Sequence, residues 1–331
     1  MLNGKTILVT GGTGSFGKCF TKYVLSNYSP KKIIIYSRDE FKQWMMQSEF
    51  AEYQDKLRFF IGDVRDCDRL KRACNGVDYI IHAAAMKQVP ACEYNPNEAI
   101  KTNISGAMNV IDAALDCRVT KVVALSTDKA VNPVNLYGGT KLVSDKLFIA
   151  ANAYVGANNI NFSIVRYGNV AGSRGSIIPF FKSIIETGSK ELPITDYRMT
   201  RFWISLNQGV ELVIKALSEA TGGETFISKI PSFKVTDLAQ AMLPDCTMKE
   251  VGIRPGEKLH EVMITTEDSM TTYEYDKYYV IYPQITWNER QKIAEGGKPV
   301  KEGFVYSSGN NAEWLSVDDI THLLKNMNED V

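Results

Sequence analysis

The chain has 331 residues, 44% apolar and 23% charged, which is the composition of a soluble globular protein with one large or two ordinary domains. Its formal net charge of +0 argues against a nucleic-acid partner or an anionic membrane surface. No apolar run approaches the length of a membrane span and the first residues lack a signal-peptide pattern, so we expect a cytoplasmic protein without a membrane partner. The six cysteines are scattered without a Cys-x-x-Cys pair, so neither a metal site nor a disulfide framework is expected.

Residues 6–10 predict a first buried strand, and a glycine-rich turn and an amphipathic helix follow it. Glycines in this turn allow the backbone to approach a pyrophosphate and let the helix pack closely on the strand. The N-terminus of the helix adds unpaired N–H groups and the positive end of a dipole. Between a strand and a helix, this glycine spacing strongly indicates a dinucleotide site. We assign to cofactor binding Gly11, Thr13, Gly14, Ser15, Phe16 and Gly17.

The second predicted strand, residues 32–36, ends where dinucleotide folds distinguish NAD from NADP. An acid at this point binds the ribose 2′-hydroxyl of NAD, whereas an arginine accommodates the 2′-phosphate of NADP. Ser37 and Arg38 come first and Lys42 follows one helical turn later, which favours NADP. Asp39 keeps NAD as an alternative, although it could instead cap the following helix.

The third and fourth predicted strands, residues 57–61 and 77–83, end in further candidates for the cofactor site. Asp63 could bind an adenine amino group, while a helix cap by Asp63 or Asp66 is the alternative. Small residues after the fourth strand let a ligand approach the backbone, and Lys87 is a candidate for phosphate or substrate. We assign to this part of the cofactor site Asp63, Val64, Ala83, Ala84 and Lys87.

A long helix is predicted from about residue 96 to residue 115, with Thr102 and Asn103 within it. An asparagine in the middle of a helix is mildly unfavourable. We therefore take Asn103 as a candidate for substrate binding, with a harmless surface position as the alternative.

The stretch from Ser126 to Lys141 is the centre of the predicted active site. The buried strand at 122–125 delivers the sequence Ser-Thr-Asp-Lys to its carboxyl end, where open α/β sheets bind ligands. A helix follows Asn132-Pro133, and on it Tyr137 and Lys141 lie one turn apart on one face. A lysine ammonium beside a phenol favours the phenolate, which makes the tyrosine usable as a base. Alone, this pair is weak evidence and is usually a surface pair.

Residues 162–167 predict a sixth strand, so strands and helices alternate up to this point. This alternation predicts an α/β fold with a Rossmann-type doubly wound parallel sheet. We place the cofactor-binding domain at 1–170, expect 203–221 to return to it, and assign 171–331 mainly to a smaller substrate-binding α/β domain. In that smaller domain, two arginines facing the nucleotide, Arg201 and Arg254, would suit a diphosphate.

The glycine turn together with Tyr137-x-x-x-Lys141 resembles the extended short-chain dehydrogenases/reductases that act on nucleotide sugars. Thr127-Asp128-Lys129 narrows the resemblance to the inverting UDP-N-acetylglucosamine 4,6-dehydratases, the PseB family, since ordinary epimerases lack the acid and base pair and retaining dehydratases carry Asp-Glu. The resemblance covers nearly the whole chain, and Gln88 is its one departure. The segments that carry it further are 36–40, 82–90, 166–170, 172–176, 199–203 and 252–258.

The resemblance implies an internal redox reaction on UDP-N-acetylglucosamine that begins pseudaminic acid synthesis. NADP accepts a hydride from C4, water leaves across C5 and C6, the hydride returns to C6, and protonation of C5 on the other face inverts that centre. Lys129 would be the base at C5 and Asp128 the acid at the C6 hydroxyl. Tyr137, assisted by Lys141, would take the C4 hydroxyl proton. Thr127 would hydrogen-bond the sugar or the tyrosine.

The resemblance also assigns binding residues and an assembly. Val170 joins the cofactor site, beside Tyr137 and Lys141. A homo-oligomer is implied, with a hexamer as the candidate assembly. The expected substrate-binding residues are Lys87, Thr102, Asn103, Asn169, Arg201, Arg254 and Glu257.

These roles set conditions on two pKa values. As a base near neutral pH, Lys129 needs a pKa well below the usual value of about 10.4, and we expect Lys141, an oxidised nicotinamide and burial to lower it. Asp128 needs a raised pKa from burial to remain a proton donor.

Two alternatives stay open. One is a UDP-sugar 4-epimerase or a retaining dehydratase, against which Lys129 after Asp128 argues. The other, from a different class, is a non-catalytic NADP-sensing regulator, which would not need Tyr137 or Lys141.

Overall fold

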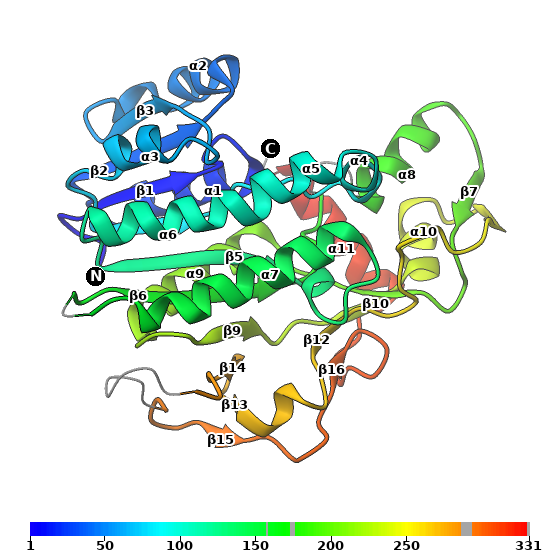
Figure 1. Cartoon of the computed structure of the whole chain (residues 1–331). Helices are drawn as coiled ribbons and strands as arrows, with labels where there is room; N and C mark the ends of the chain where they lie inside the picture. Colours follow the sequence, from blue (N-terminus) through cyan, green and yellow to red (C-terminus); the bar gives the residue numbers. More distant parts are fainter. Residues whose placement is uncertain (157, 173–175, 286–292, 330–331) are drawn as a thin grey trace.

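A large central sheet organises the chain (Figure 1). The structure is a computed structural model that describes residues 1–156, 158–172, 176–285 and 293–329. Within these residues the sheet has ten strands in the order β15-β13-β14-β9-β6-β5-β4-β1-β2-β3. Part of the loop at 172–176, namely Ser173, Arg174 and Gly175, lies outside the described residues.

Six strands of this sheet run parallel in the order β3-β2-β1-β4-β5-β6, which is the strand order of Rossmann dinucleotide folds. The predicted fold class is therefore confirmed, and each predicted strand is present within about two residues of its expected bounds. The strands are β1 (Thr6–Thr10), β2 (Lys32–Ser37), β3 (Leu57–Ile61), β4 (Tyr79–His82), β5 (Lys121–Thr127) and β6 (Asn161–Tyr167).

Helices cover both faces of the parallel part, and each face has its own buried core. One core receives Phe20, Met46 and Val213 from three helices, and the other receives Leu70, Val110 and Phe148 from three more. Burial on both faces explains why the strands read as unbroken apolar runs. The first face carries α1 (Ser15–Asn27), α2 (Glu40–Glu49) and α9 (Leu206–Glu219), and the second carries α3 (Cys67–Cys74), α6 (Gly106–Asp116) and α7 (Leu136–Ala150).

The second half of the chain contributes more to this sheet than the sequence predicted. Helix α9 packs against α1, within the range 203–221 that was expected to return. Beyond that range, β9 (Thr225–Ser228) pairs in parallel with β6, and β14 (Tyr278–Ile281), β13 (Thr272–Glu274) and β15 (Lys298–Pro299) continue the edge in antiparallel fashion. These strands have two to four residues, too few to show a periodicity in the sequence.

A smaller lobe packs around a third core that contains Phe181, Trp203, Phe233, Leu238 and Ile320. In Figure 1 it lies beside the ends of the parallel strands. Its role in substrate binding stays a prediction. It contains α8 (Ile177–Glu186), β7 (Glu191–Ile194), β8 (Thr200–Phe202), β10 (Ser232–Lys234), α10 (Val235–Met242), β11 (Thr247–Glu250) and α11 (Val317–Glu329), while β12 (Val262–Ile264) and β16 (Tyr306–Ser307) form a ribbon beside it.

The helix predicted at 96–115 is interrupted by a π-helical turn. It runs as α5 (Pro96–Ile100), the turn Lys101–Ser105, and α6, and a short helix, α4 (Val89–Tyr94), precedes it. Such turns are rare and are frequent at functional sites. In the part of the chain that the structure describes, no helix is both long and apolar enough to cross a bilayer.

Candidate active site

The glycine turn has the shape that a dinucleotide pyrophosphate needs. Gly11 has φ +65°, and a Cβ on it would lie 2.9 Å from the backbone nitrogen of Ala84. Helix α1 begins at Ser15, with Gly14 at its N-cap and without a capping side chain. Gly11 therefore lets the turn pack against the backbone that follows β4, and the N–H groups of the first helical turn suit a diphosphate.

Gly17 packs helix α1 against the turn, and we expect Gly17→Ala to destabilise the fold. A Cβ on Gly17 would lie 2.3 Å from the carbonyl oxygen of Gly12, so backbone would have to move. Overpacking of this kind costs about 1–3 kcal/mol of the free energy of unfolding, which urea denaturation would measure. Gly139→Ala in α7 is the matched control, because its Cβ would meet nothing within 4 Å. Equal stability of the two variants would contradict the packing argument.

At the end of β2, Asp39 caps the N-terminus of helix α2. Asp39 accepts a hydrogen bond from the backbone N–H of Lys42 at 2.9 Å and pairs with Lys42 Nζ at 2.6 Å. The Ser37 hydroxyl lies 2.9 Å from that of Thr13, which ties β2 to the glycine turn. Arg38 leaves 65% of its side chain exposed. Of the two readings of Asp39, the structure supports the helix cap, and Arg38 remains open to a ligand.

The carboxylate of Asp63 is held by Arg65, through Nε at 3.0 Å and Nη2 at 2.8 Å. Asp66, not Asp63, caps the following helix by accepting from the backbone N–H of Arg69. Val64 is buried against α6, where a Cβ on Gly106 would lie 2.8 Å from its Cγ2. The adenine contact proposed for Asp63 stays a prediction.

Asn103 is a buried connector. Only 1% of it is exposed, so the alternative of a surface position is wrong. Its amide bonds both the N–H and the carbonyl of Met86 at 2.8 Å, and its Nδ2 donates to Thr140 Oγ1 at 2.9 Å. Asn103 therefore fixes the loop that carries Ala83, Ala84 and Lys87 to helix α7. Its predicted contact with substrate, and that of the buried Thr102, stay predictions.

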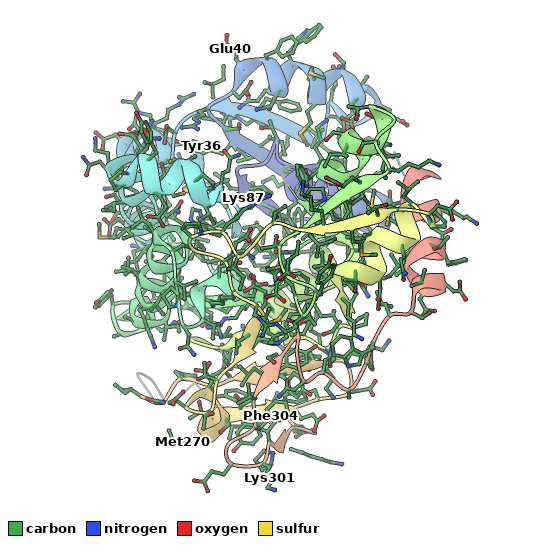
Figure 2. The ribbon with its side chains drawn as sticks, turned by 90° about the vertical axis from the view of Figure 1, so that its right-hand side faces the viewer. Tyr36, Glu40, Lys87, Met270, Lys301 and Phe304 are labelled. Carbon is green, nitrogen blue, oxygen red and sulfur yellow. The ribbon has the colours of Figure 1, made fainter. Side chains whose placement is uncertain are left out.

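Figure 2 looks from the side of the smaller lobe and shows Lys87 between Tyr36 of β2 and Phe304 near the opposite end of the molecule. Val170, which follows β6 in the chain, forms a parallel bridge with Ile204. Both remain candidates for ligand contacts.

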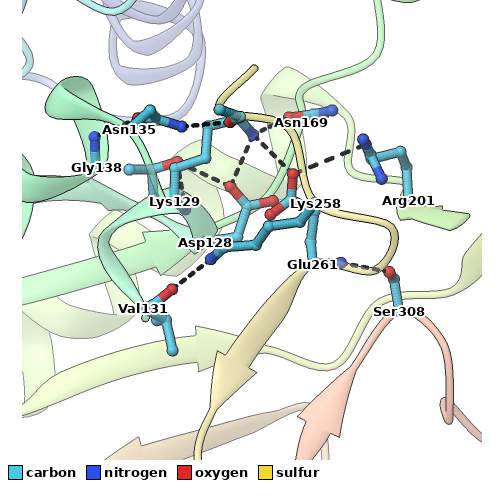
Figure 3. A network of polar contacts seen from close by, with 12 residues as sticks. Asp128, Lys129, Val131, Asn135, Gly138, Asn169, Arg201, Lys258, Glu261 and Ser308 are labelled. Atoms are coloured by element: carbon cyan, nitrogen blue, oxygen red, sulfur yellow. Dashed lines mark hydrogen bonds and ion pairs between the residues drawn. The ribbon is translucent and has the colours of Figure 1, made fainter. Parts of the chain in front are cut away.

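Asp128 is the buried acid of the site (Figure 3). It is 0% exposed, and its Oδ1 accepts from Thr127 Oγ1 at 2.9 Å and from Lys129 Nζ at 3.0 Å. Its Oδ2 is buried and has no hydrogen-bond partner among the described residues. Burial and the charge of Glu261 raise the pKa of Asp128, as expected for a proton donor. When Asp128 is protonated, its free Oδ2 is the oxygen that can carry the proton.

Lys129 is surrounded by acceptors. Its Nζ donates to Asp128 Oδ1 at 3.0 Å and to Asn169 Oδ1 at 2.9 Å, and lies 3.4 Å from Glu261 Oε1. Burial lowers the pKa of Lys129, but the nearby carboxylates of Asp128 and Glu261 outweigh it and the net change is upward. The expectation of a lowered pKa is therefore wrong for this state of the protein, because two acids, not Lys141, dominate its surroundings.

Tyr137 is buried in helix α7, whose N-cap Asn135 accepts from the backbone N–H of Gly138 at 2.8 Å. Burial raises the pKa of the Tyr137 phenol to about 12, although the charge of Lys129 and the hydroxyl of Thr127 lower it in part. The expected lowering by Lys141 is wrong here. Burial lowers the pKa of Lys141 itself, and the charge of Asp145 offsets this in part.

The smaller lobe supplies a carboxylate that the sequence reading missed. Glu261 is 2% exposed, and its Oε1 lies 3.4 Å from Lys129 Nζ and 3.8 Å from Arg201 Nε. Arg201, which was predicted, donates through Nη1 to the carbonyl of Thr200 at 2.7 Å. Lys258 donates to the carbonyl of Val131, which joins the two lobes beside the site. Nothing in the sequence around Glu261 marks it, since it lies outside the charged cluster at 254–258.

The two remaining candidates from the cluster at 254–258 differ in their exposure to solvent. Arg254 is exposed, with its guanidinium 5.8 Å from the ring centre of Phe180. Glu257 is half-buried, and its Oε2 has no hydrogen-bond partner within the described ranges. Their contacts with substrate stay predictions.

Together these groups form one acid–base centre at the carboxyl end of β5. It combines a carboxylic acid with a free oxygen, an amine held between two acids, and a buried phenol. Such a set can move protons to and from neighbouring carbon and oxygen atoms of a bound sugar.

Comparison with known proteins places the whole chain in a family. The family described as "Polysaccharide biosynthesis protein" matches residues 7–283. The UDP-N-acetylglucosamine 4,6-dehydratase (inverting) of Campylobacter jejuni subsp. jejuni serotype O:23/36 is 58% identical over 330 residues, 98% of this chain and 98% of that protein. The UDP-glucose 4-epimerase of Rickettsia canadensis is 42% identical, over 98% and 96% of the two chains.

Among solved structures, Pen from Bacillus thuringiensis superimposes with a TM-score of 0.91 and is 38% identical, over 99% of both chains. This agreement extends through the smaller lobe as well as the central sheet. The chain therefore belongs to the polysaccharide biosynthesis protein family of the extended short-chain dehydrogenases/reductases, together with the inverting UDP-N-acetylglucosamine 4,6-dehydratases that it resembles over its whole length.

Proposed function

We propose that this protein is a hydro-lyase, which removes water from UDP-N-acetylglucosamine and inverts C5, giving UDP-2-acetamido-2,6-dideoxy-β-L-arabino-hex-4-ulose. The observation that carries the proposal is the pair formed by the buried Asp128 and the half-buried Lys129, bonded at 3.0 Å at the carboxyl end of β5. An elimination across C5 and C6 needs an acid and a base side by side, which a simple 4-epimerisation does not. The relative at 58% identity carries the name of this activity.

The side chains divide the proton transfers of this reaction. The C4 hydroxyl proton goes to Tyr137, with Thr127 beside it and Lys141 one turn along α7. Once C4 is a ketone, the proton at C5 is acidic and Lys129 removes it as an amine. Asp128 donates its proton from Oδ2 to the departing C6 hydroxyl, so that the leaving group is water.

The cofactor proposed is NADP, which supplies the hydride acceptor at C4 and returns the hydride to C6. The glycine turn would hold the pyrophosphate, and Arg38 and Ser37 would face the 2′-phosphate. Asp39 supports this choice because its carboxylate is engaged as the cap of α2 and by Lys42 at 2.6 Å. We expect NADP to bind more tightly than NAD in a fluorescence titration of the cofactor-free protein, and the reverse order would contradict the choice.

We further propose that the reaction is the first step of pseudaminic acid synthesis, carried out in the cytoplasm by a homo-oligomer for which a hexamer is the candidate. UDP-N-acetylglucosamine would contact Lys87, Asn169, Arg201, Arg254 and Glu257. The support for the pathway and the assembly is the family, and the support for the substrate contacts is the placement of Asn169 at Lys129 and of Arg201 at Glu261.

The test is to incubate the purified protein with UDP-N-acetylglucosamine in heavy water and to follow the sugar by NMR. We expect loss of the C6 hydroxyl, a 4-keto group, inversion at C5 and deuterium at C5. A 4-keto-6-deoxy sugar with C5 retained would keep the dehydration and overturn the inversion.

Two other outcomes would replace the proposal. Conversion to the C4 epimer, with the C6 hydroxyl kept, would show a UDP-sugar 4-epimerase, the activity named for the relatives at 42% identity. No conversion of this or any other nucleotide sugar by a protein with bound NADP would show a non-catalytic regulator.

A further inference from the structure

Glu261 poses a chemical question that the proposed function does not answer. It is a buried carboxylate, 2% exposed, beside the lysine that removes the C5 proton. Its Oε2 has no hydrogen-bond partner in the described part of the chain. An unpartnered buried carboxylate oxygen costs stability, so its presence beside Lys129 calls for a physical explanation.

Backbone contacts hold this carboxylate in place. The N–H of Glu261 donates to Ser308 Oγ at 2.9 Å, and the N–H of Ser308 donates back to the carbonyl of Glu261 at 2.8 Å. The Ser308 hydroxyl also lies 2.8 Å from Thr200 Oγ1 on β8. The backbone of Glu261 is therefore held by Ser308, independently of Lys129 (Figure 3).

The surroundings of Lys129 determine where its proton can go. A lysine ammonium has three N–H donors, and Lys129 Nζ has three acceptors within 3.4 Å, from Asp128, Asn169 and Glu261. The ammonium nitrogen of Lys129 has no lone pair, so one proton has to leave before Lys129 can act as a base. The amide of Asn169 cannot accept it. Asp128 acts as the acid and carries its own proton, which leaves Glu261.

We propose that Glu261 accepts the proton of the Lys129 ammonium and thereby turns Lys129 into the free amine that removes the C5 proton. One N–H bond of Lys129 breaks and one O–H bond of Glu261 forms, so an ion pair becomes a neutral pair of unchanged total charge. Glu261 acts through Lys129 and is a positioning residue in this sense. The inference rests on the proposed function and adds Glu261 to the residues that remove the C5 proton.

The charges that face the pair hold it as an ion pair in the substrate-free protein. Burial raises the pKa of Glu261, but Lys129, Arg201 and Lys258 outweigh it and keep Glu261 ionised, so the bound sugar has to drive the proton transfer. Asp128 and Tyr137 are the other titratable groups coupled to Lys129. A buried site disfavours both members of an ion pair, so exclusion of water by a bound sugar favours the neutral pair.

The test uses the holoenzyme with UDP-N-acetylglucosamine in single-turnover mixing. Formation of reduced nicotinamide reports oxidation at C4, and its decay reports elimination and hydride return. In Glu261→Gln we expect reduced nicotinamide to form as in the wild type and its decay to slow at least about tenfold at neutral pH. Without its acceptor, Lys129 loses the proton to solvent, so decay should rise about tenfold for each pH unit below its pKa.

The shape of the pH profile separates the proposal from a merely structural role. Wild type should show no such rise, and Glu261→Asp, which keeps a carboxylate, should restore the wild-type shape at a lower rate. Glu267→Gln, at an exposed position on the same segment, is the matched control. Decay in Glu261→Gln that is unchanged, or slowed equally at every pH, would overturn the inference. A wild-type protein that forms no keto sugar would overturn the proposed function itself.

Discussion

Lys129→Met is expected to lower the rate of dehydration by about 10²–10⁴-fold, the range of a lost general base, while oxidation at C4 continues. Methionine keeps the length of the side chain and removes the amine, so no group remains at this point to take the C5 proton. Reduced nicotinamide should then accumulate after mixing with substrate, and the C5 proton should not exchange in heavy water. Absorbance and NMR measure the two effects in one sample.

The change also alters the charge of the site. Lys129 lies between two buried acids, 3.0 Å from Asp128 and 3.4 Å from Glu261, and its removal raises the pKa of both. Thermal unfolding should therefore accompany the kinetics. Lys146→Met, at an exposed position of α7, is the control and should keep wild-type rates. Dehydration by Lys129→Met at the wild-type rate would remove Lys129 as the base.

The parallel half of the fold follows from the sequence because each strand there is an apolar run between turn residues. β1 and β3 begin and end where the pattern of residues 6–10 and 57–61 places them. Helix α7 begins directly after Asn135, an asparagine cap that sequence reasoning can recognise. Local signals of this kind are sufficient for these elements.

The edge of the sheet and part of the site do not follow from local signals. β9, β13, β14 and β15 are short, and tertiary pairing decides their strand conformation. Glu261 reaches Lys129 from 132 positions along the chain, and the contact exists only because the β12–β16 ribbon packs beside η3 (Asp128–Ala130). A distant acid of this kind cannot be identified from its neighbours in the sequence.

The pKa values of Tyr137 and Lys129 also could not be predicted from the sequence. The sequence places Lys141 one turn from Tyr137 and correctly predicts that both lie on one helix. It gives no measure of burial, and burial decides the pKa of Tyr137, which rises to about 12. The pKa of Lys129 is raised by Asp128, its neighbour in the sequence, and by Glu261, whose place at the site the sequence does not show.

Tyr137→Phe is expected to lower kcat/KM by about 10²–10⁴-fold by blocking the first step, oxidation at C4. The phenol has to lose its proton to act as a base, and its pKa of about 12 in the free protein means that the phenolate is rare near neutral pH. For wild type, log kcat/KM should therefore rise with pH over the neutral range. In Tyr137→Phe this rise should vanish together with the formation of reduced nicotinamide. Tyr154→Phe, at a position that is 66% exposed, should leave both unchanged.

The comparison with Lys129→Met makes this result decisive. Both variants should fail to form the 4-keto-6-deoxy sugar, but only the lysine variant should accumulate reduced nicotinamide, because elimination follows oxidation. Accumulation in both would mean that another group takes the C4 hydroxyl proton and that Tyr137 serves the later steps. Accumulation in neither would mean that Lys129 already contributes to the oxidation, as its charge does when it lowers the pKa of the Tyr137 phenol. The order of the two proton transfers, and their division between the two residues, can thus be measured on one absorbance signal.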